Sequence, residues 1–556
     1  MKVNPKLLSI LMISVLLLVS SSCKNERQTA DLIVTEAKIW TENISQPWAN
    51  AMAVSDDTIM AVGSNDEILK LKGTNTKVID LKGNFVVPGF IDSHVHFLTG
   101  GFNLSSVQLR DANTKEEFIK RISDYAKTVK PGTWILGGDW DHKPWGGILP
   151  DKDWIDKFTP DNPVFVTRLD GHMSLANSLA MKLAGINDGV KDIEGGTIVR
   201  NSAGKLTGIF KENAILLIEN KIPPPSEEQT DKALIKAMDY VASNGVTSVH
   251  HMVGNLDAIE RARDNHSLIT RIYAMTSIEN WKSLKEQIVK NGNGDKWLRI
   301  GGVKAFVDGS LGSHTAAFLS PFSDSPADSG FFVNTEDDLY KWTLNADKEG
   351  LQVLIHAIGD RANRFLLDMY DSVAKVNGPR DRRFRIEHAQ HIAPDDIIRF
   401  SKSNIIPSMQ PYHLIDDGRW AEKVLGSERI KTTYPFKSLF DSGASVTFGS
   451  DWFVAPPTPL EGIYAAVTRR TLDNKNPDGW VPEQKITVEQ ALTAYTKNGA
   501  YASFEENIKG TLETGKLADF VVINQDLTKI DPVKIREAKV LQTYVGGKKV
   551  YNSSGQ

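Results

Sequence analysis

Two histidines, His94 and His96, close the segment PGFIDSHVH near the start of the chain. Side chains alternate along a strand, so residues i and i+2 point to the same side. At the carboxyl end of a barrel strand, two such imidazoles would converge on one metal ion. The His-x-His spacing alone is a weak signal, because short motifs match by chance. Its interpretation depends on the other polar residues at strand ends.

More candidate ligands follow apolar runs elsewhere in the chain. LIH ends at His356, RIEH ends at His388, and FGSD ends at Asp451. One histidine at a strand end is more often structural than a ligand. Four histidines and an aspartate at equivalent positions are harder to explain as structural residues and favour a metal centre.

Lys304 stands inside the apolar segment GVKAF. Burial of an unpaired ammonium group costs too much free energy to be tolerated. We therefore predict that the pKa of this amine is lowered, or that the amine is covalently modified.

The segments that carry these residues alternate with helical stretches, which is typical of parallel βα units. Helices are predicted over residues 335–348 and 362–376, among others. Strands are predicted at 85–96, 133–138, 164–168, 246–250, 300–307, 353–356, 385–388, 405–410 and 445–449. We expect an α/β fold in which eight of these strands form a (β/α)8 barrel within residues 88–500. The ninth is assigned to an insertion at about 98–225, after the first barrel strand.

Both ends of the chain are rich in short strands, which predicts one small β-sandwich assembled from residues 31–87 and 501–556. Four tryptophans lie in the insertion, and we interpret them as core of that unit rather than as a shelf for substrate. They are Trp134, Trp140, Trp145 and Trp154.

The composition is that of an ordinary globular protein, with 41% hydrophobic and 24% charged residues among 556. The formal net charge is -4. A nucleic-acid partner is excluded on this basis, because phosphate binding needs a clustered positive surface.

The first residues resemble a bacterial lipoprotein signal. Lys2 and Lys6 precede the apolar run 7–19, and three serines lead to Cys23, the only cysteine in the chain. We expect cleavage after residue 22, lipidation of Cys23 and a tether over 23–30. The protein would then be anchored by lipid in a bacterial cell envelope, with its catalytic domain outside the cytoplasm. A plain secretory signal with an incidental cysteine is the alternative. A single cysteine also excludes an internal disulfide and argues against a cysteine-based zinc site.

Taken together, the motifs PGFIDSHVH, GVKAFVDGSLGSHTAA, LIHAIGDRA, RIEHAQ, MQPYH and FGSDW resemble the amidohydrolase superfamily. The most similar branch contains the YtcJ-like and N-substituted formamide deformylase-like proteins. The resemblance covers residues 31–550. It implies a (β/α)8 barrel with a composite β-sandwich, and a homodimer as the assembly.

The resemblance also implies a role for each ligand. His94 and His96 would hold one divalent metal, with Asp451 as a further ligand, and His356 and His388 would hold a second. Lys304 matches the lysine that is carbamylated in binuclear members and bridges both ions. Zinc is the default, although iron, manganese or nickel is not excluded. An unmodified Lys304 paired with a carboxylate is the alternative.

The implied reaction is hydrolysis of a carbon–nitrogen bond in a small N-acyl or N-formyl amide. Asp451 would accept a proton from the attacking water and deliver it to the leaving nitrogen. Substrate contacts are predicted for His172, Asp308, His314 and Gln410. His314 stands where relatives often carry arginine, which puts their substrate preference in doubt for this chain.

Two other functions are consistent with the same fold. The first is a metal-dependent deaminase of a ring substrate, but the stretch from His356 to Asp360 lacks the glutamate that such enzymes use as a proton shuttle. The second is a metal-free, surface-anchored binding protein. The complete set of candidate ligands argues against it, because a degenerate relative would have lost at least one of them.

Overall fold

The computed structural model describes residues 29–555 except 143–144, 169–172 and 194–195. The predicted signal peptide, the lipidation site Cys23 and the predicted substrate residue His172 therefore lie outside the described residues. No helix in the described part of the chain is long and apolar enough to cross a membrane.

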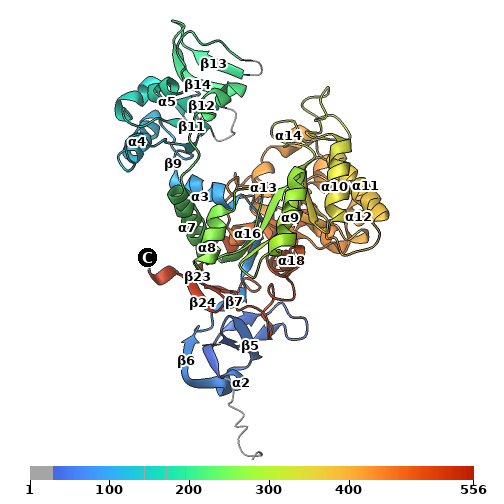
Figure 1. Ribbon diagram of the computed structural model, residues 1–556. Helices are drawn as coiled ribbons and strands as arrows, with labels where there is room; N and C mark the ends of the chain where they lie inside the picture. The colour runs from blue at the N-terminus through green and yellow to red at the C-terminus, as the bar shows by residue number, and fades with distance from the viewer. Residues whose placement is uncertain (1–28, 143–144, 169–172, 194–195, 556) are drawn as a thin grey trace, which may run out of the picture.

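Eight parallel strands form a barrel at the centre of the molecule (Figure 1). A parallel bridge between Val95 and Trp452 joins the last strand to the first. Helices such as α10 (Glu336–Lys348) and α11 (Asp360–Asn377) connect successive strands. The (β/α)8 prediction is confirmed. In order around the barrel, the strands are β8 (Phe90–Val95), β15 (Val246–His251), β16 (Arg271–Ser277), β17 (Leu298–Phe306), β18 (Gln352–Ala357), β19 (Arg385–His388), β20 (Ile406–Met409) and β21 (Thr447–Phe448).

The barrel strands read as apolar runs because both of their faces are covered. Every residue of β18 is buried, from Gln352 to Ala357. Parallel strands in α/β folds have side chains packed inside the barrel and helices packed outside, so they lack the polar alternation of an exposed sheet. A polar residue in such a strand, such as His356, needs a specific reason to be there.

The expected strand count was wrong in one detail. Seven of the nine predicted strands belong to the barrel and two, at 133–138 and 164–168, fall in the insertion. The third barrel strand, β16, was not predicted. It begins with Arg271, whose side chain is 1% exposed and forms a bidentate ion pair with Asp519. The compensating charge lies 248 residues further along the chain, so no local pattern shows that this arginine is buried.

The insertion is a separate lobe beside the barrel, drawn in cyan and green in Figure 1. Its six-stranded sheet is covered by α4 (Lys115–Ala126) and α5 (Ser178–Leu183). Trp140 is fully buried in this lobe and the other three tryptophans pack against its two apolar clusters, as interpreted from the sequence. The strand order is β13 (Gly196–Arg200), β14 (Leu206–Glu212), β12 (Met173–Ala176), β11 (Phe165–Arg168), β10 (Gly137–Trp140) and β9 (Val107–Gln108).

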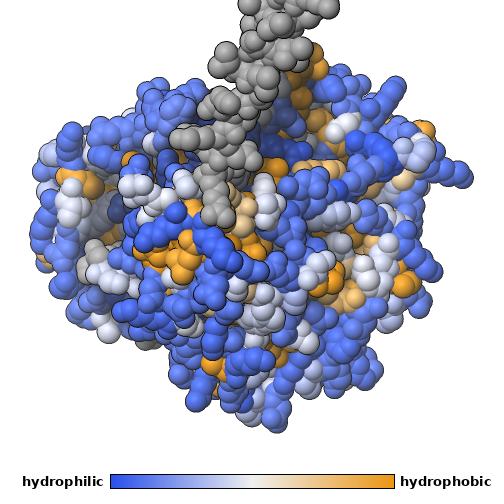
Figure 2. Space-filling model, turned by 90° about the horizontal axis from the view of Figure 1, so that it is seen from below, coloured by the Kyte–Doolittle hydropathy of each residue, from blue (hydrophilic) through white to orange (hydrophobic). Residues whose placement is uncertain are grey.

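Both ends of the chain build the β-sandwich. Strand β7 (Phe85–Pro88) pairs antiparallel with β22 (Phe520–Ile523), and a second sheet contains β1 (Ala30–Thr35) and β4 (Ala51–Ser55). One apolar cluster contains residues of both sheets. Seen from the sandwich side, the surface is largely hydrophilic, with apolar residues in separate groups (Figure 2). The sandwich packs at the amino ends of the barrel strands, because β7 runs directly into β8 and Asp519 binds Arg271 at the start of β16.

Candidate metal centre

All predicted ligands lie at the carboxyl ends of barrel strands. His94 is near the end of β8 and His388 is the last residue of β19. Lys304 and His356 lie close to the ends of β17 and β18, and Asp451 follows β21. Loops at this face of a (β/α)8 barrel carry the active site in essentially every characterised enzyme with this fold.

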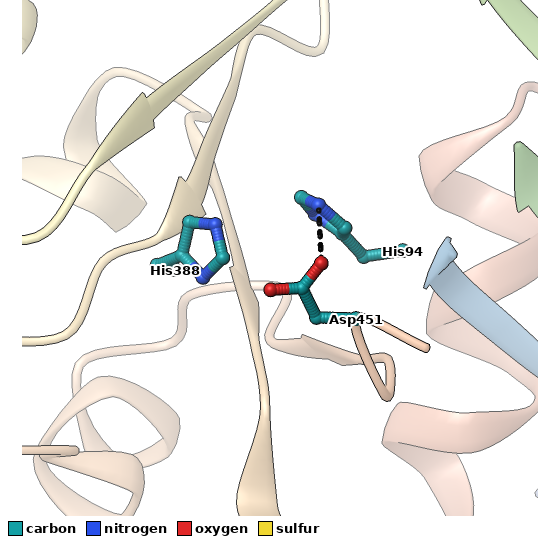
Figure 3. A group of neighbouring side chains, drawn as sticks. All are labelled: His94, His388 and Asp451. Carbon is teal, nitrogen blue, oxygen red and sulfur yellow. Dashed lines mark ion pairs between the residues drawn. The ribbon is translucent and has the colours of Figure 1, made fainter. Parts of the chain in front are cut away.

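The centre is built around His94, His388 and Asp451. One ligand atom from each lies within 4.8 Å of the other two, and all three residues are buried. Their two rings and the carboxylate point toward one another (Figure 3). The dashed line marks the contact of 3.5 Å between His94 Nε2 and Asp451 Oδ1.

His96 approaches the same carboxylate from the other end of the His-x-His pair. Its Nε2 lies 3.3 Å from Asp451 Oδ1. Ligand atoms bound to one tetrahedral zinc ion at about 2.0 Å lie ~3.3 Å from one another. The spacing of His94, His96 and Asp451 therefore fits a shared metal ion.

His356 extends the cluster on the side of His388, since the centroids of the two rings are 4.4 Å apart. The Nε2 atom of His356 is 3.0 Å from the carbonyl oxygen of Gly309. The structure thus brings together both predicted histidine pairs, with His388 between His94 and His356.

Burial keeps these imidazoles neutral. Burial and the charge of Lys304 lower the pKa of His94 to about 4. The same causes lower the pKa of His356 to about 3, while burial and the neighbouring His356 hold the pKa of His388 well below its usual value. A neutral imidazole offers the lone pair that a metal requires.

Asp451 is ionised in this setting. Burial alone would raise its pKa, but the hydrogen bond with His96 and the adjacent imidazoles bring the pKa well below its usual value. Its backbone is left-handed, with φ of 58°, and His388 has φ of 70°. A left-handed backbone at a residue with a Cβ costs free energy, and such residues cluster at functional sites.

Lys304 is 2% exposed and faces the same cluster. Burial lowers the pKa of its amine to about 8, against the raising effect of Glu387 and Asp451. Its Nζ lies 3.9 Å from the sulfur of Met252. This agrees with the prediction of a lowered pKa, and it leaves a nucleophilic amine beside the candidate ligands.

The residues predicted to contact substrate have different surroundings. Asp308 is buried, and its carboxylate accepts N–H groups of Ala317, Ile358 and Gly359, so it holds two loops together. His314 is half-exposed and bonds to Asp324 at 3.0 Å through its Nε2.

Gln410 is buried directly after β20 and begins α13 (Pro411–Asp417). The fourth predicted substrate residue, His172, is not among the described residues.

One polar residue of the centre, Glu387, was not assigned from the sequence, and the contacts of a second, His413, were not foreseen. Glu387 accepts a hydrogen bond from His94 Nδ1 at 2.6 Å. His413 lies parallel to His388, with ring centroids 6.4 Å apart, and its buried Nε2 has no hydrogen-bond partner among the described residues. Both belong to segments singled out above, RIEHAQ and MQPYH, but only the folded chain shows what they contact.

The pair His250-His251, which had no assigned role, has two structural ones. His251 Nδ1 accepts the backbone N–H of Phe97, the residue that follows His96. His250 contacts Arg385 inside the barrel at 2.9 Å.

Comparison with known proteins agrees with this geometry. The sequence profile of the amidohydrolase family matches residues 77–551. The chain belongs to the amidohydrolase family. This amidohydrolase is 42% identical over 537 residues to Protein LONG AFTER FAR-RED 3 of Arabidopsis thaliana, which covers 94% of this chain and 92% of the relative. It is 27% identical over 548 residues to N-substituted formamide deformylase of Arthrobacter pascens, covering 95% and 99%.

Among solved structures, it is similar to an uncharacterized metal-dependent hydrolase from Pyrococcus horikoshii, with a TM-score of 0.77 and 27% identity, covering 90% of this chain and 99% of that one. The predicted resemblance is confirmed. Family membership, this structural neighbour and the His/Asp cluster together support metal-dependent hydrolysis with a divalent metal.

Proposed function

We propose that the protein hydrolyses a carbon–nitrogen bond of a small N-acyl or N-formyl amide at a centre of two divalent metals. One observation carries the proposal. Three neutral imidazoles and an ionised carboxylate converge at the catalytic face of a (β/α)8 barrel, with a buried lysine beside them. These residues are His94, His356, His388, Asp451 and Lys304.

The donor set fits zinc or a similar borderline metal. His94, His96 and Asp451 would hold one ion, and His356 and His388 the other. When bound, such ions activate a water molecule and polarise the carbonyl oxygen of the substrate. The spacing of the side chains supports the first ion, with imidazole nitrogens 3.3 and 3.5 Å from Asp451 Oδ1. The assignment of His356 and His388 to the second ion follows the family resemblance, and their ring centroids lie 4.4 Å apart.

Asp451 moves the proton in this mechanism. Its carboxylate is ionised and therefore accepts a proton from the attacking water. It then delivers this proton to the nitrogen of the leaving amine, so that the carbon–nitrogen bond breaks without release of an unstable amide anion. His413 lies beside His388, and its Nε2 has no hydrogen-bond partner in the described part of the chain, so we assign it to bind the substrate next to the reacting bond.

Lys304 contributes as a carbamate. The neutral amine adds carbon dioxide and releases one proton, which converts the side chain into an anion with two oxygens. A lowered pKa favours this reaction because only the uncharged amine is a nucleophile. The carbamate would supply an anionic ligand to both ions, in a position where an unpaired ammonium group would be costly.

The amide class is supported by the relative from Arthrobacter pascens, which is a deformylase of N-substituted formamides. A deaminase is less consistent with the site. The acidic residue that follows His356, Asp360, accepts the backbone N–H of Leu319 and holds a loop. A metal-free binding protein would have no need for three buried neutral imidazoles around an anionic carboxylate, because such a set costs stability unless it binds a ligand.

Metal analysis of a soluble form that starts after Cys23 tests the proposal, beside the variant Lys304→Ala. We expect about two metal ions per chain in the wild type and a sharp fall in the variant. Hydrolysis of N-formyl and N-acetyl amines should follow the metal content. A wild type that binds no metal after incubation with zinc and bicarbonate would overturn the proposal. One ion in both forms would remove Lys304 from the centre.

We also propose that Cys23 carries a lipid that tethers the protein to the cell envelope. The described chain starts in β1 of the sandwich, at the amino ends of the barrel strands. A tether leaving there would keep the metal centre, at the opposite end of the barrel, free for soluble substrates. Labelling of cells with a radioactive fatty acid should mark the wild type and not Cys23→Ala. Equal labelling of both would exclude the anchor.

A further inference from the structure

Glu387 crosses the interior of the barrel to reach His94. The two residues lie on β19 and β8, which are separated by β20 and β21 on the shorter way around the closed barrel. Glu387 Oε2 is 2.6 Å from His94 Nδ1, and the glutamate side chain is fully buried. The reason lies in the strand geometry: residues of β19 that point inward face the opposite wall of the barrel.

This contact determines which nitrogen of His94 carries the proton. An ionised carboxylate can only accept, so Nδ1 must donate and Nε2 must keep its lone pair. Nε2 is the atom that lies 3.5 Å from Asp451 Oδ1. With the other tautomer, an N–H group would point into the centre and His94 could not bind a metal there.

Glu387 is held in turn by Arg385, the inward-facing residue two positions earlier. Arg385 Nε donates to Glu387 Oε1 at 2.7 Å. The guanidinium is fully buried, and its other nitrogens donate to groups on three further strands. These are Ser93 O on β8 at 2.6 Å, Ser408 Oγ on β20 at 3.0 Å and His250 Nδ1 on β15 at 2.9 Å.

His250 is the last residue in this series of hydrogen bonds. A guanidinium cannot accept a hydrogen bond, so His250 Nδ1 is the acceptor and its ring is neutral. Burial and the charge of Arg385 agree with this state, since both hold the pKa of His250 well below its usual value. The ring packs edge-on against Tyr273, with centroids 5.6 Å apart.

We propose that Glu387 is a positioning residue that fixes the tautomer and orientation of His94 for metal binding, and that Arg385, braced by His250, holds Glu387 in place. The inference rests on the proposed metal centre for its purpose, but the contacts that carry it exist without a metal. Metal-ligating histidines commonly donate their second N–H to a carboxylate, and loss of such a partner weakens metal binding about 10–100-fold. Here the carboxylate comes from across the barrel and depends on a buried cation.

The variant Glu387→Gln separates positioning from packing. Glutamine keeps the volume, but its amide has only one acceptor oxygen. This oxygen can accept from His94 or from Arg385, so one of the two contacts is lost. We expect metal affinity, measured by competition with a chromophoric chelator, to fall about 10–100-fold. The matched control is Glu505→Gln, which removes another buried carboxylate that pairs with Lys509 at 2.8 Å. This control should bind metal like the wild type.

A second readout uses the metal-free protein. The ¹⁵N chemical shifts of histidine-labelled wild type should show His94 protonated on Nδ1, and this population should fall in Glu387→Gln. Unchanged affinity together with unchanged tautomer would overturn the inference. A wild type without metal affinity would overturn the proposed function, while the tautomer measurement would still decide whether Glu387 positions His94. If Glu387→Gln fails to fold, Arg385→Lys gives the same test. Lysine keeps the positive charge but cannot make all the hydrogen bonds by which the guanidinium joins β19 to β8, β15 and β20.

Discussion

Replacement of Gly449 by alanine should displace His94. Gly449 directly follows β21 and lies against β8. A Cβ at this position would lie 2.5 Å from the backbone nitrogen of His94, 2.9 Å from its Cβ and 3.0 Å from Asp92 Oδ1. The first two atoms belong to the backbone and Cβ of His94, and Asp92 Oδ1 is held by the backbone N–H of Ser450 at 2.9 Å. Two adjacent barrel strands would have to separate.

The size of the effect follows from these distances. The contact with the His94 nitrogen must open by about 0.9 Å to become an ordinary van der Waals contact. Overpacking of this kind costs about 1–3 kcal/mol of stability. A displacement near 1 Å at a catalytic group costs about 100-fold in rate. We therefore expect a moderate loss of stability but a large loss of kcat/KM and of metal affinity.

Thermal unfolding, metal titration and kinetics on an N-formyl amide measure the three effects. Gly312→Ala is the matched control, because the nearest atom to its added Cβ is 3.6 Å away, in the ring of Trp420. This control should change stability by less than about 0.5 kcal/mol. The reasoning is refuted if Gly449→Ala keeps metal affinity and kcat/KM within about twofold of the wild type.

Three further predictions concern stability. Asp519→Ala should lower the free energy of unfolding in urea by about 3–5 kcal/mol, because it leaves Arg271 buried without its bidentate partner; a loss below 1 kcal/mol would contradict this. Burial lowers the pKa of His391 from 6.5 to about 3, so between these pH values the imidazole is protonated in the unfolded chain and neutral in the native protein. Stability should therefore fall as pH drops from 6.5 toward 3, and this fall should be shallower in His391→Gln. Removal of metal by a chelator should lower the apparent Tm. An ion that binds only the native state, present at 1,000 times its Kd, adds about 4 kcal/mol to the free energy of unfolding. An unchanged Tm would argue against a resident metal.

The position of the candidate ligands could be predicted from the sequence because it is a local property. An apolar run that ends in histidine or aspartate indicates a buried strand with a polar group at its carboxyl end, and parallel strands bring such ends together. His356 and His388 were found in this way, each at the end of its strand. The sequence could not show how the polar groups pair. His94 and Glu387 are 293 residues apart, and nothing near either of them indicates the contact.

Buried charge also explains where prediction from the sequence failed. Strand β16 was missed because its first residue, Arg271, has the appearance of a surface residue until Asp519 is placed beside it. Asp308 stands after the strand of Lys304 and was predicted to face substrate, and this role stays a prediction. Its carboxylate accepts three backbone N–H groups from two loops and lies 3.6 Å from His356 Nε2, contacts that its position in the sequence does not show. Sequence patterns indicate whether a residue is buried more readily than they indicate its partner, because partners are set by the closed fold.

Three buried ion pairs fall into two sets by their place along the barrel, and this division predicts how variants will behave. Arg271–Asp519 and Lys509–Glu505 lie on the sandwich side, at the amino ends of the strands, where they join the sandwich and the C-terminal segment to the barrel.

The Arg385–Glu387 pair lies toward the carboxyl ends, in contact with His94. Loss of a pair in the first set removes contacts that exist with or without metal, so stability should fall equally in the metal-free and metal-bound protein. Loss of Glu387 should instead reduce the stabilisation that metal adds, because its partner His94 is a proposed ligand. The difference in Tm between metal-bound and metal-free protein therefore separates the two sets, even where single variants lower stability to the same extent.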